Sequence, residues 1–315
     1  MLNSTHTSPK WAMAFELNIL RRLEFDSVAI PFSPESAIAA YLRRMNVRVA
    51  ANDIFRSNEA RCTAKVGNFD HSLSNDDIDV ILDDVYVPGY RLQNAALSNW
   101  FSETDAWWFD NIRRNIDKLN SPGAQAIAAM LAIEVGNYVL SFNEETRQLR
   151  QPLSVVYRRF WSMEPDKRIG FADSQITNTT AEEMVSNVKT IERYSDLLFL
   201  RLPEPHVNSM RDFAGRGTWA EEWIRGEDTF WDGLESSMSG RFGGPTATRS
   251  QYLSMLDQLL GRASNMKKWA ISMMEYGSLT SQDIVDVVME HRRVDSVFTK
   301  DLSELTGTKA IMITA

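Results

Sequence analysis

The sequence predicts an α/β fold in which helices surround a mostly parallel sheet. Residues 25–32 ("FDSVAIPF"), a helical pattern in "SPESAIAAYLRRM" and residues 47–53 ("VRVAAND") read as strand, helix and strand within about 30 residues. A unit of this kind joins parallel strands. Residues 196–202 ("DLLFLRL") form another continuous apolar run, which is typical of a strand buried on both faces.

Helices are expected on either side of the first strand. Apolar residues recur every four positions from Trp11 to Leu23 and indicate an amphipathic helix. After the strand, Ser33 is suited to the N-cap and Pro34 to the first helical position. We therefore expect the second helix to follow the strand directly.

The middle of the chain has a different pattern. Long helical patterns cover "SNWFSETDAWWFDNIRRNIDKL" and "GAQAIAAMLAIEVGNYVL", with a turn at "NSPG" between them. We interpret residues 96–164 as a helical insertion that separates the halves of the sheet domain, residues 1–95 and 165–315.

The second half returns to alternating strands and helices. Strand character is expected in "KRIGFADSQ", "KKWAISMMEYG" and "KAIMITA", and helices in "AEEMVSNVKTIERY", "QYLSMLDQLLGRA" and "TSQDIVDVVMEHR". The last helix has Thr280 or Ser281 as its cap. The glycines and proline of "FGGPTATR" indicate a mobile loop.

Composition limits the function classes. The net charge of -8 opposes nonspecific binding to a polyanion. A single cysteine excludes an intrachain disulfide, and four scattered histidines show no zinc spacing, so we expect no metal site. No run approaches the roughly 20 apolar residues of a membrane span, and the N-terminus does not resemble a secretory signal. We expect a cytoplasmic protein without membrane contact.

Local basic clusters are candidates for nucleic-acid contacts despite the acidic balance. They are equally compatible with solvated helix faces. The candidate residues are Arg147, Arg150, Arg158, Arg159, Lys267 and Lys268.

The order of the elements, with the residues at each turn from Trp11 to Ala315, resembles the D12 class (Dam-like) of adenine-N6 DNA methyltransferases. The resemblance is most specific in "YLSMLDQLLGRASNMKKWAISMMEYGSLTSQDIVDVVMEHRRV" and the closing "KAIMITA". It implies a Rossmann-like methyltransferase mixed sheet with helices on both faces and a helical insertion of the DNA-recognition type.

The resemblance also implies where S-adenosylmethionine would bind. The family has a Phe-x-Gly-x-Gly turn after the first strand, and this chain has "FSPES", which keeps Phe32 but lacks the glycines. Asp53 matches the family's ribose-binding acid and Asp173 the acid near the adenine. Either aspartate also suits a turn or a helix cap. We expect no cofactor, unless the pocket for S-adenosylmethionine has survived the change of turn.

The family's catalytic turn, Asp-Pro-Pro-Tyr, is altered as well. The matching residues at the end of "DLLFLRLPEPH" are Arg201, Leu202, Pro203 and Glu204. An arginine cannot accept a hydrogen bond from the adenine amino group and repels a sulfonium. In a shifted register, Glu204 would accept that hydrogen bond and His206 would stack on the base.

Two altered motifs favour a methyltransferase-like protein that is not an enzyme. We expect a partner or regulatory subunit in a DNA-related system, paired with an active methyltransferase or another defence or modification component. A nucleic-acid-binding module is one alternative, in which Trp100, Trp107, Trp108 and Trp161 either stack on bases or lie in the core. The other alternative is an active, divergent adenine-N6 methyltransferase. Aromatic residues around Trp219 and Trp231 suit either a protein interface or the core.

Overall fold

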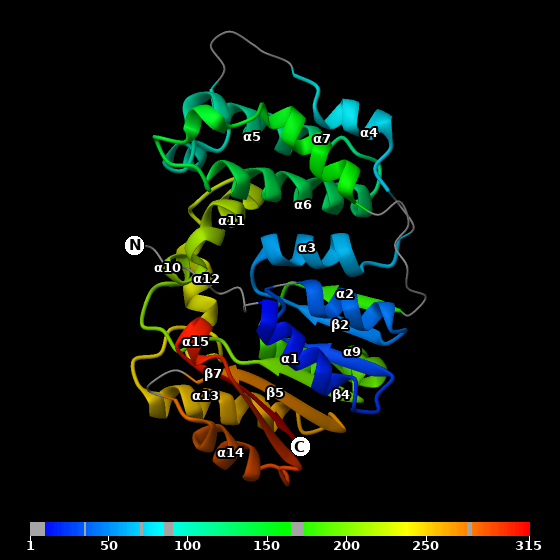
Figure 1. Ribbon diagram of the computed structural model, residues 1–315, viewed down its shortest axis with the longest axis vertical. Helices are drawn as coiled ribbons and strands as arrows, with labels where there is room; N and C mark the ends of the chain where they lie inside the picture. Colours follow the sequence, from blue (N-terminus) through cyan, green and yellow to red (C-terminus); the bar gives the residue numbers. More distant parts are fainter. Residues whose placement is uncertain (1–9, 35, 70–71, 85–90, 165–172, 276–278) are drawn as a thin grey trace.

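A mixed sheet forms the base of the molecule (Figure 1). The computed structural model describes residues 10–34, 36–69, 72–84, 91–164, 173–275 and 279–315. Within them, the strands follow the order β3-β2-β1-β4-β5-β7-β6. The strands are β1 (Ser27–Ile30), β2 (Arg48–Asn52), β3 (Ser174–Thr177), β4 (Leu197–Arg201), β5 (Lys268–Met274), β6 (Ser296–Asp301) and β7 (Lys309–Thr314).

Strands β1 to β5 run parallel, and β7 runs antiparallel between β5 and β6. The strand order reverses between β1 and β4, so the loops after these strands diverge there. In doubly wound folds, ligands bind at the carboxyl ends of the strands beside such a switch point. A ligand-binding site is therefore expected at this edge of the sheet, which is called the carboxyl edge below.

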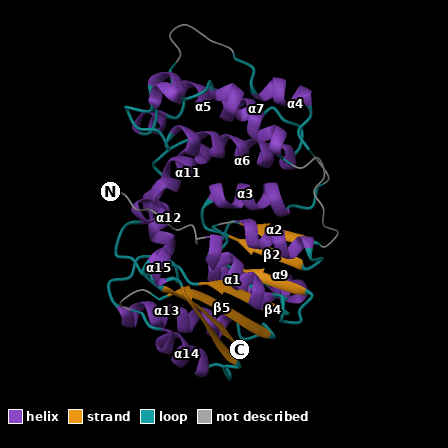
Figure 2. Cartoon of the chain, viewed as in Figure 1, coloured by secondary structure: helices purple, strands orange, loops and turns teal. Residues whose placement is uncertain are grey.

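Helices cover both faces of the sheet, so the prediction of an α/β fold with a mostly parallel, mixed sheet is confirmed (Figure 2). The apolar run of β4 explains the arrangement, because Leu197 and Phe199 join one core cluster while Leu198 and Leu200 join the other. The first face carries α1 (Lys10–Leu20), α2 (Ser36–Arg44) and α3 (Arg56–Val66). The second carries α8 (Ala181–Ser186), α9 (Val188–Tyr194), α13 (Arg249–Arg262) and α14 (Ser281–Met289).

A separate group of helices, called the helical layer below, packs on α3 away from the sheet (Figure 1). Its members are α4 (Asn75–Ile81), η1 (Ala95–Asn99), α5 (Glu103–Ile116), α6 (Pro122–Val139), η2 (Arg147–Leu149), α7 (Leu153–Met163) and α11 (Thr218–Arg225). Its core starts before residue 96, at Leu73, and includes Trp219 and Trp223 from α11. The helical layer therefore extends beyond the expected insertion on both sides in the sequence.

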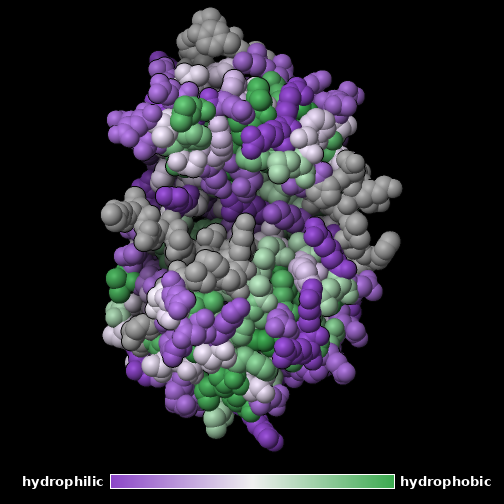
Figure 3. Space-filling view, in the orientation of Figure 1, coloured by the Kyte–Doolittle hydropathy of each residue, from purple (hydrophilic) through white to green (hydrophobic). Residues whose placement is uncertain are grey.

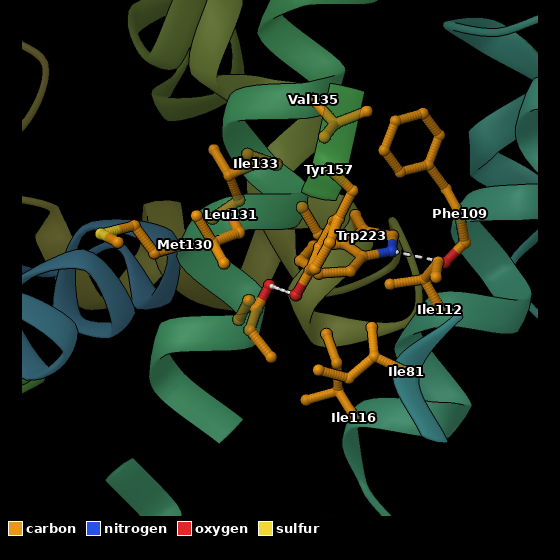
Figure 4. Packing of buried hydrophobic residues seen from close by; sticks show 14 of the residues in the cluster. Ile81, Phe109, Ile112, Ile116, Met130, Leu131, Ile133, Val135, Tyr157 and Trp223 are labelled. Atoms are coloured by element: carbon orange, nitrogen blue, oxygen red, sulfur yellow. Dashed lines mark hydrogen bonds between the residues drawn. The ribbon is translucent and has the colours of Figure 1, made fainter. Parts of the chain in front are cut away.

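Large side chains and polar anchors hold the helical layer together (Figure 4). Tyr157 donates to the Ala128 carbonyl at 3.2 Å, and Trp223 donates through Nε1 to the Phe109 carbonyl at 2.8 Å. Both rings are fully buried, so these bonds satisfy polar atoms that water cannot reach.

A small cluster joins the helical layer to the sheet domain. Met210, Trp231, Leu234 and Met238 pack together in it. They belong to α10 (Met210–Ala214) and α12 (Trp231–Met238), while η3 (Gly215–Gly217) leads into α11 and α15 (Ser303–Thr306) precedes β7.

The structure differs from the sequence prediction at three local features. Helix α2 begins at Ser36, so Ser33 is not its N-cap and is instead buried beside β2. Strand β6 was not expected, because its side chains are mostly exposed at the sheet edge and show no apolar period. The segment "FGGPTATR", expected as a mobile loop, has Phe242 fully buried and packed against Tyr252.

The start of α14 agrees with the sequence prediction. Thr280 is the N-cap of α14 and forms a capping box with Asp283. Of the helices that the structure describes, none is both long enough and apolar enough to cross a membrane.

Candidate functional site

Arg201 ends β4 at the carboxyl edge and is bound to a buried glutamate. Its Nε and Nη2 atoms donate to the two carboxylate oxygens of Glu16 on α1, at 3.0 and 2.5 Å. Ser272 on β5 donates to the same carboxylate at 2.6 Å. The strand alternation that turns Leu197 and Phe199 toward α1 turns Arg201 the same way. The Arg201 side chain therefore forms an internal, bidentate ion pair with Glu16.

Phe32, which follows β1, is in contact with the segment around Phe242. The two rings meet edge to face, with centroids 5.7 Å apart. Gly243 has a φ of +89°, and a Cβ there would come within 2.8 Å of Phe32 Cε1. A glycine is thus required at this position, because the backbone turns left-handed and passes close to the ring. The Phe242 ring and the Gly243 backbone therefore lie directly beside the partly buried Phe32 ring.

The segment containing Phe242 is tied to the loops after β3 and β4. The Phe242 N–H donates to Glu182 at 2.7 Å, and the Thr246 N–H donates to the His206 carbonyl at 2.7 Å. Arg241 donates to Thr180 and Glu183. Residues 241–246 therefore bridge two loops of the carboxyl edge.

Asp53 lies at the carboxyl end of β2, as the sequence predicted for a ribose-binding acid. Its Oδ1 accepts hydrogen bonds from the Phe55 N–H at 3.0 Å and from Asn58 at 3.1 Å. Burial raises the pKa of Asp53 to about 7, and the nearby Glu221 adds to the rise, while these hydrogen bonds oppose it. Near neutral pH the carboxyl is therefore only partly ionised.

Asn52, which the sequence analysis did not select, connects the loops of three strands. Its amide donates to the carbonyls of Pro31 and Thr179, at 3.1 and 2.8 Å. Its oxygen accepts from Thr177 and from the backbone and side chain of Thr179. All of these groups lie at the carboxyl edge, so Asn52 holds the loops after β1 and β3 together.

The residues that follow Arg201, from Leu202 to Glu204, differ in how they contact the rest of the protein. Leu202 is buried in the second core, and the Pro203 carbonyl accepts from Tyr252 at 2.8 Å. Glu204 has an exposed position, and partial desolvation raises the pKa of its carboxyl. No hydrogen bond or ion pair of the Glu204 side chain occurs within the described ranges.

His206 is engaged on one ring face and at both nitrogens. Its ring stacks on Phe213 with centroids 3.8 Å apart. Nδ1 lies 3.0 Å from the Asn208 carbonyl and Nε2 lies 3.5 Å from the Gly243 carbonyl. Burial lowers the pKa of His206. The ring is thus part of the packing around Gly243, and its contact with Phe213 covers one of its two faces.

Asp173 does not join the other predicted site residues. It precedes β3 and therefore lies at the amino edge of the sheet, whereas Asp53 follows β2 at the carboxyl edge. Asp173 accepts from Asn68 at 2.7 Å and from Tyr194 at 3.1 Å, and it pairs with Arg193. The structure therefore places Asp173 at the opposite edge of the sheet from Asp53 and does not bring the two predicted cofactor-binding acids together.

The arginines of the helical layer that are candidates for nucleic-acid contacts differ in their exposure and in their ion pairs. Arg150 donates to both oxygens of the buried Asp105 at 3.0 Å and is structural. Arg158 pairs with Asp79 on α4 at 3.0 Å. Arg147 and Arg159 are exposed.

The lysine candidates lie elsewhere, at the amino edge of the sheet. Lys267 pairs with Asp196 at 2.6 Å, and Lys268 donates to the Glu24 carbonyl at 2.6 Å. The six candidates therefore fall in two separate regions.

The aromatic candidates belong to the core of the helical layer and its neighbours. Trp219 and Trp223 are fully buried and Trp231 is almost so, which rules them out as an exposed interface. Trp100, Trp108 and Trp161 are partly buried and pack against the core of the helical layer, and Trp107 is half-buried.

Two glutamates of α11, which the sequence analysis did not select, are fully buried and have structural roles. Glu221 accepts from the N–H groups of Arg56 and Ser57, at 2.9 and 2.8 Å, and so caps the N-terminus of α3. Glu222 accepts from Trp100 and Trp231 at 2.7 and 3.0 Å. In the sequence, the only signal for this role was that both lie within "TWAEEW", flanked by tryptophans.

A surface hollow of about 520 Å³ lies at the amino edge, away from Asp53. Of the predicted site residues, only Lys267 lines it. Arg292 lies 3.8 Å over the Trp269 ring and donates to the carbonyls of residues 264, 266 and 267. These hydrogen bonds stabilise the turn before β5.

The surface between the helical layer and the sheet is largely hydrophilic in the view of Figure 3. No group of three or more His, Cys, Asp and Glu side chains suited to a metal ion occurs in the described part of the chain. No family model matches the sequence, and no curated protein matches it.

Proposed function

We propose that this chain is a methyltransferase-like protein without methyl-transfer activity, which serves as a partner or regulatory subunit in a DNA-related system. The observation that carries the proposal is the ion pair between Arg201 and Glu16. It occupies the strand end at which the resemblance to the Dam-like family requires a hydrogen-bond acceptor for the adenine amino group.

Neither member of the ion pair is suited to accept a hydrogen bond from the adenine amino group. All five N–H groups of a guanidinium are donors, so Arg201 offers no lone pair to the amino group. The Glu16 carboxylate does have lone pairs, but it accepts from Arg201 and Ser272 and is 1% exposed. The shifted register is disfavoured as well, because His206 already stacks on Phe213.

The surroundings of Phe32 also oppose binding of S-adenosylmethionine. Phe242 and Gly243 pack against Phe32, the one residue of the family's cofactor-binding turn that this chain keeps, which supports the expectation that no cofactor binds there. The acid that remains, Asp53, is partly protonated near pH 7 and is a weaker acceptor for ribose hydroxyls.

A protein partner is favoured over a nucleic acid by the charges. The chain carries a net charge of -8, and Arg150, Arg158 and Lys267 are each paired with an aspartate. Phosphate contacts depend on clustered, available cations. The partner that fits this proposal is an active methyltransferase or another component of a modification system.

Calorimetric titration with S-adenosylmethionine tests the proposal. We expect no binding heat up to millimolar cofactor for the natural chain or for Asp53→Ala. Asp173→Ala is the matched control, because Asp173 lies at the amino edge. Micromolar binding that is lost in Asp53→Ala and retained in Asp173→Ala would overturn the proposal and favour an active enzyme.

The regulatory part of the proposal has its own test. A purified adenine-N6 methyltransferase is assayed on duplex DNA with and without this chain. We expect co-elution at a fixed ratio and a changed rate of methyl transfer. No association, together with DNA affinity of this chain that falls linearly with salt on logarithmic axes, would favour the nucleic-acid-binding alternative.

A further inference from the structure

Helix α7 exposes an apolar and basic stripe on the outside of the helical layer. Val156 and Tyr157 point into the core. Val155, Arg159 and Met163 are exposed and lie four residues apart, so they share one side of the helix. Met163 is 71% exposed and Val155 is 50% exposed.

Helix α4 lies beside α7 and exposes an acidic stripe. The ion pair between Asp79 and Arg158, and the hydrogen bond from Trp161 Nε1 to the Leu73 carbonyl at 3.1 Å, connect the two segments. On the exposed side of α4, Asp76 and Val80 lie four residues apart. An acidic stripe with an apolar residue therefore lies next to a basic stripe with apolar residues.

Asp76 and Arg159 are the charged members of the two stripes. Neither Asp76 nor Arg159 takes part in an ion pair among the residues that the structure describes. Figure 3 shows hydrophobic and hydrophilic residues mixed over this outer part of the molecule. Exposed apolar side chains that cluster with polar neighbours are typical of interaction surfaces.

We propose that the α4/α7 patch, comprising Asp76, Val80, Val155, Arg159 and Met163, binds a second copy of this chain around a twofold axis. In such an isologous contact the same patch on both copies must be self-complementary. Turning one copy by half a turn brings its acidic α4 stripe against the basic α7 stripe of the other. Every attractive contact then forms twice.

The mixture of charges favours this occupant. A surface for nucleic acid would be uniformly basic, because phosphates repel Asp76 and Asp79. A patch with an acidic stripe beside a basic stripe is instead electrostatically complementary to the same patch on a second copy related by a twofold rotation. Val80 and Met163 supply the apolar contacts between the charges.

The contact is expected to be weak and salt-sensitive. Stable interfaces bury about 800 Å² on each partner, and the two short stripes provide a smaller contact. Exposed ion pairs are screened by salt. We therefore expect a monomer–dimer equilibrium that shifts toward monomer as the salt concentration rises.

Sedimentation equilibrium of the full chain tests this proposal over a range of protein concentrations at low and high salt. Met163→Asp and Arg159→Glu are each expected to weaken dimerisation about tenfold or more. The matched control is Met289→Asp, since Met289 is 62% exposed on α14, on the far side of the sheet domain. Circular dichroism checks that each variant folds.

A charge exchange distinguishes a direct contact from a general effect of charge. Arg159→Glu combined with Asp76→Arg is expected to recover much of the dimerisation lost in Arg159→Glu alone. A natural chain that stays monomeric at high concentration would overturn the proposal. So would a dimer that neither Met163→Asp nor Arg159→Glu weakens. The proposal does not depend on cofactor binding or on the proposed function.

Discussion

Arg201 and Glu16 lie 185 residues apart in the chain and form a bidentate ion pair inside the protein, with Nη2 to Oε2 at 2.5 Å. The pair joins the end of β4 to α1, and Ser272 extends it to β5. An arginine that looked misplaced at the end of an apolar strand is therefore a structural anchor for the first helix.

Removing one partner of this pair is expected to destabilise the fold strongly. Glu16→Ala leaves Arg201 without its counter-charge in a mostly buried position, which costs about 3 to 5 kcal/mol. Urea unfolding measures the change in the free energy of unfolding. The control is Asp117→Ala in the exposed pair with Arg113, for which we expect a change of less than about 1 kcal/mol.

Replacing both partners provides the contrasting result. Glu16→Leu together with Arg201→Met is expected to recover most of the loss, because an apolar pair has no desolvation penalty. Equal destabilisation of the single and double variants would contradict the assignment of Arg201 as a paired structural residue.

Stability is expected to fall as pH rises toward neutrality because of Asp53. Its pKa is raised from 3.8 to about 7 in the folded chain. The protonated form is therefore favoured by folding, so this contribution is complete below pH 4 and is lost as the pH rises to about 7. The full effect is on the order of 4 kcal/mol.

Asp53→Asn isolates this contribution. The amide oxygen can still accept from Phe55 and Asn58, while the ionisation is removed. Thermal unfolding between pH 5 and 8 should show a smaller loss of stability with rising pH in the variant. Parallel pH profiles for the two proteins would exclude Asp53 as the cause.

Gly136 on α6 is expected to tolerate no larger residue. A Cβ there would overlap the ring of Trp219, which is fully buried in the core of the helical layer. Gly136→Ala should cost about 1 to 3 kcal/mol through overpacking. Gly233→Ala on α12 is the control, because a Cβ there has open space, and it should stabilise the chain by about 0.5 to 1 kcal/mol.

Glu221 is expected to stabilise the start of α3. Glu221→Gln keeps an acceptor but removes the charge that faces the N–H groups of Arg56 and Ser57 and the side chain of Arg225. Charge-assisted bonds of this kind contribute about 1.5 to 3 kcal/mol each, so unfolding should occur at lower urea concentration. Hydrogen exchange should accelerate at residues 56 and 57, and an unchanged exchange rate there would argue against the cap.

The local sequence was sufficient to predict the strands that consist of apolar runs and to predict the α/β class of the fold. Strands β1, β2, β4, β5 and β7 were expected from runs that must be buried on both faces. The long helical pattern expected around residues 98–119 is also present as α5, which buries Ile112 and Ile116. Strand β6 was not foreseen, because an exposed edge strand depends on its pairing with β7 and has no apolar pattern of its own.

Contacts between distant residues were decided only by the tertiary structure. The sequence placed Asp53 and Arg201 at strand ends, but it did not show that Glu16 binds Arg201, that Phe242 packs on Phe32, or that Glu221 caps α3. It also did not show that Asp173 lies at the opposite edge of the sheet from Asp53, because the local pattern did not show where β3 begins. The local pattern of apolar and polar residues predicts which side chains are buried and in which kind of element. The partner of a charged side chain instead depends on which elements the fold brings together.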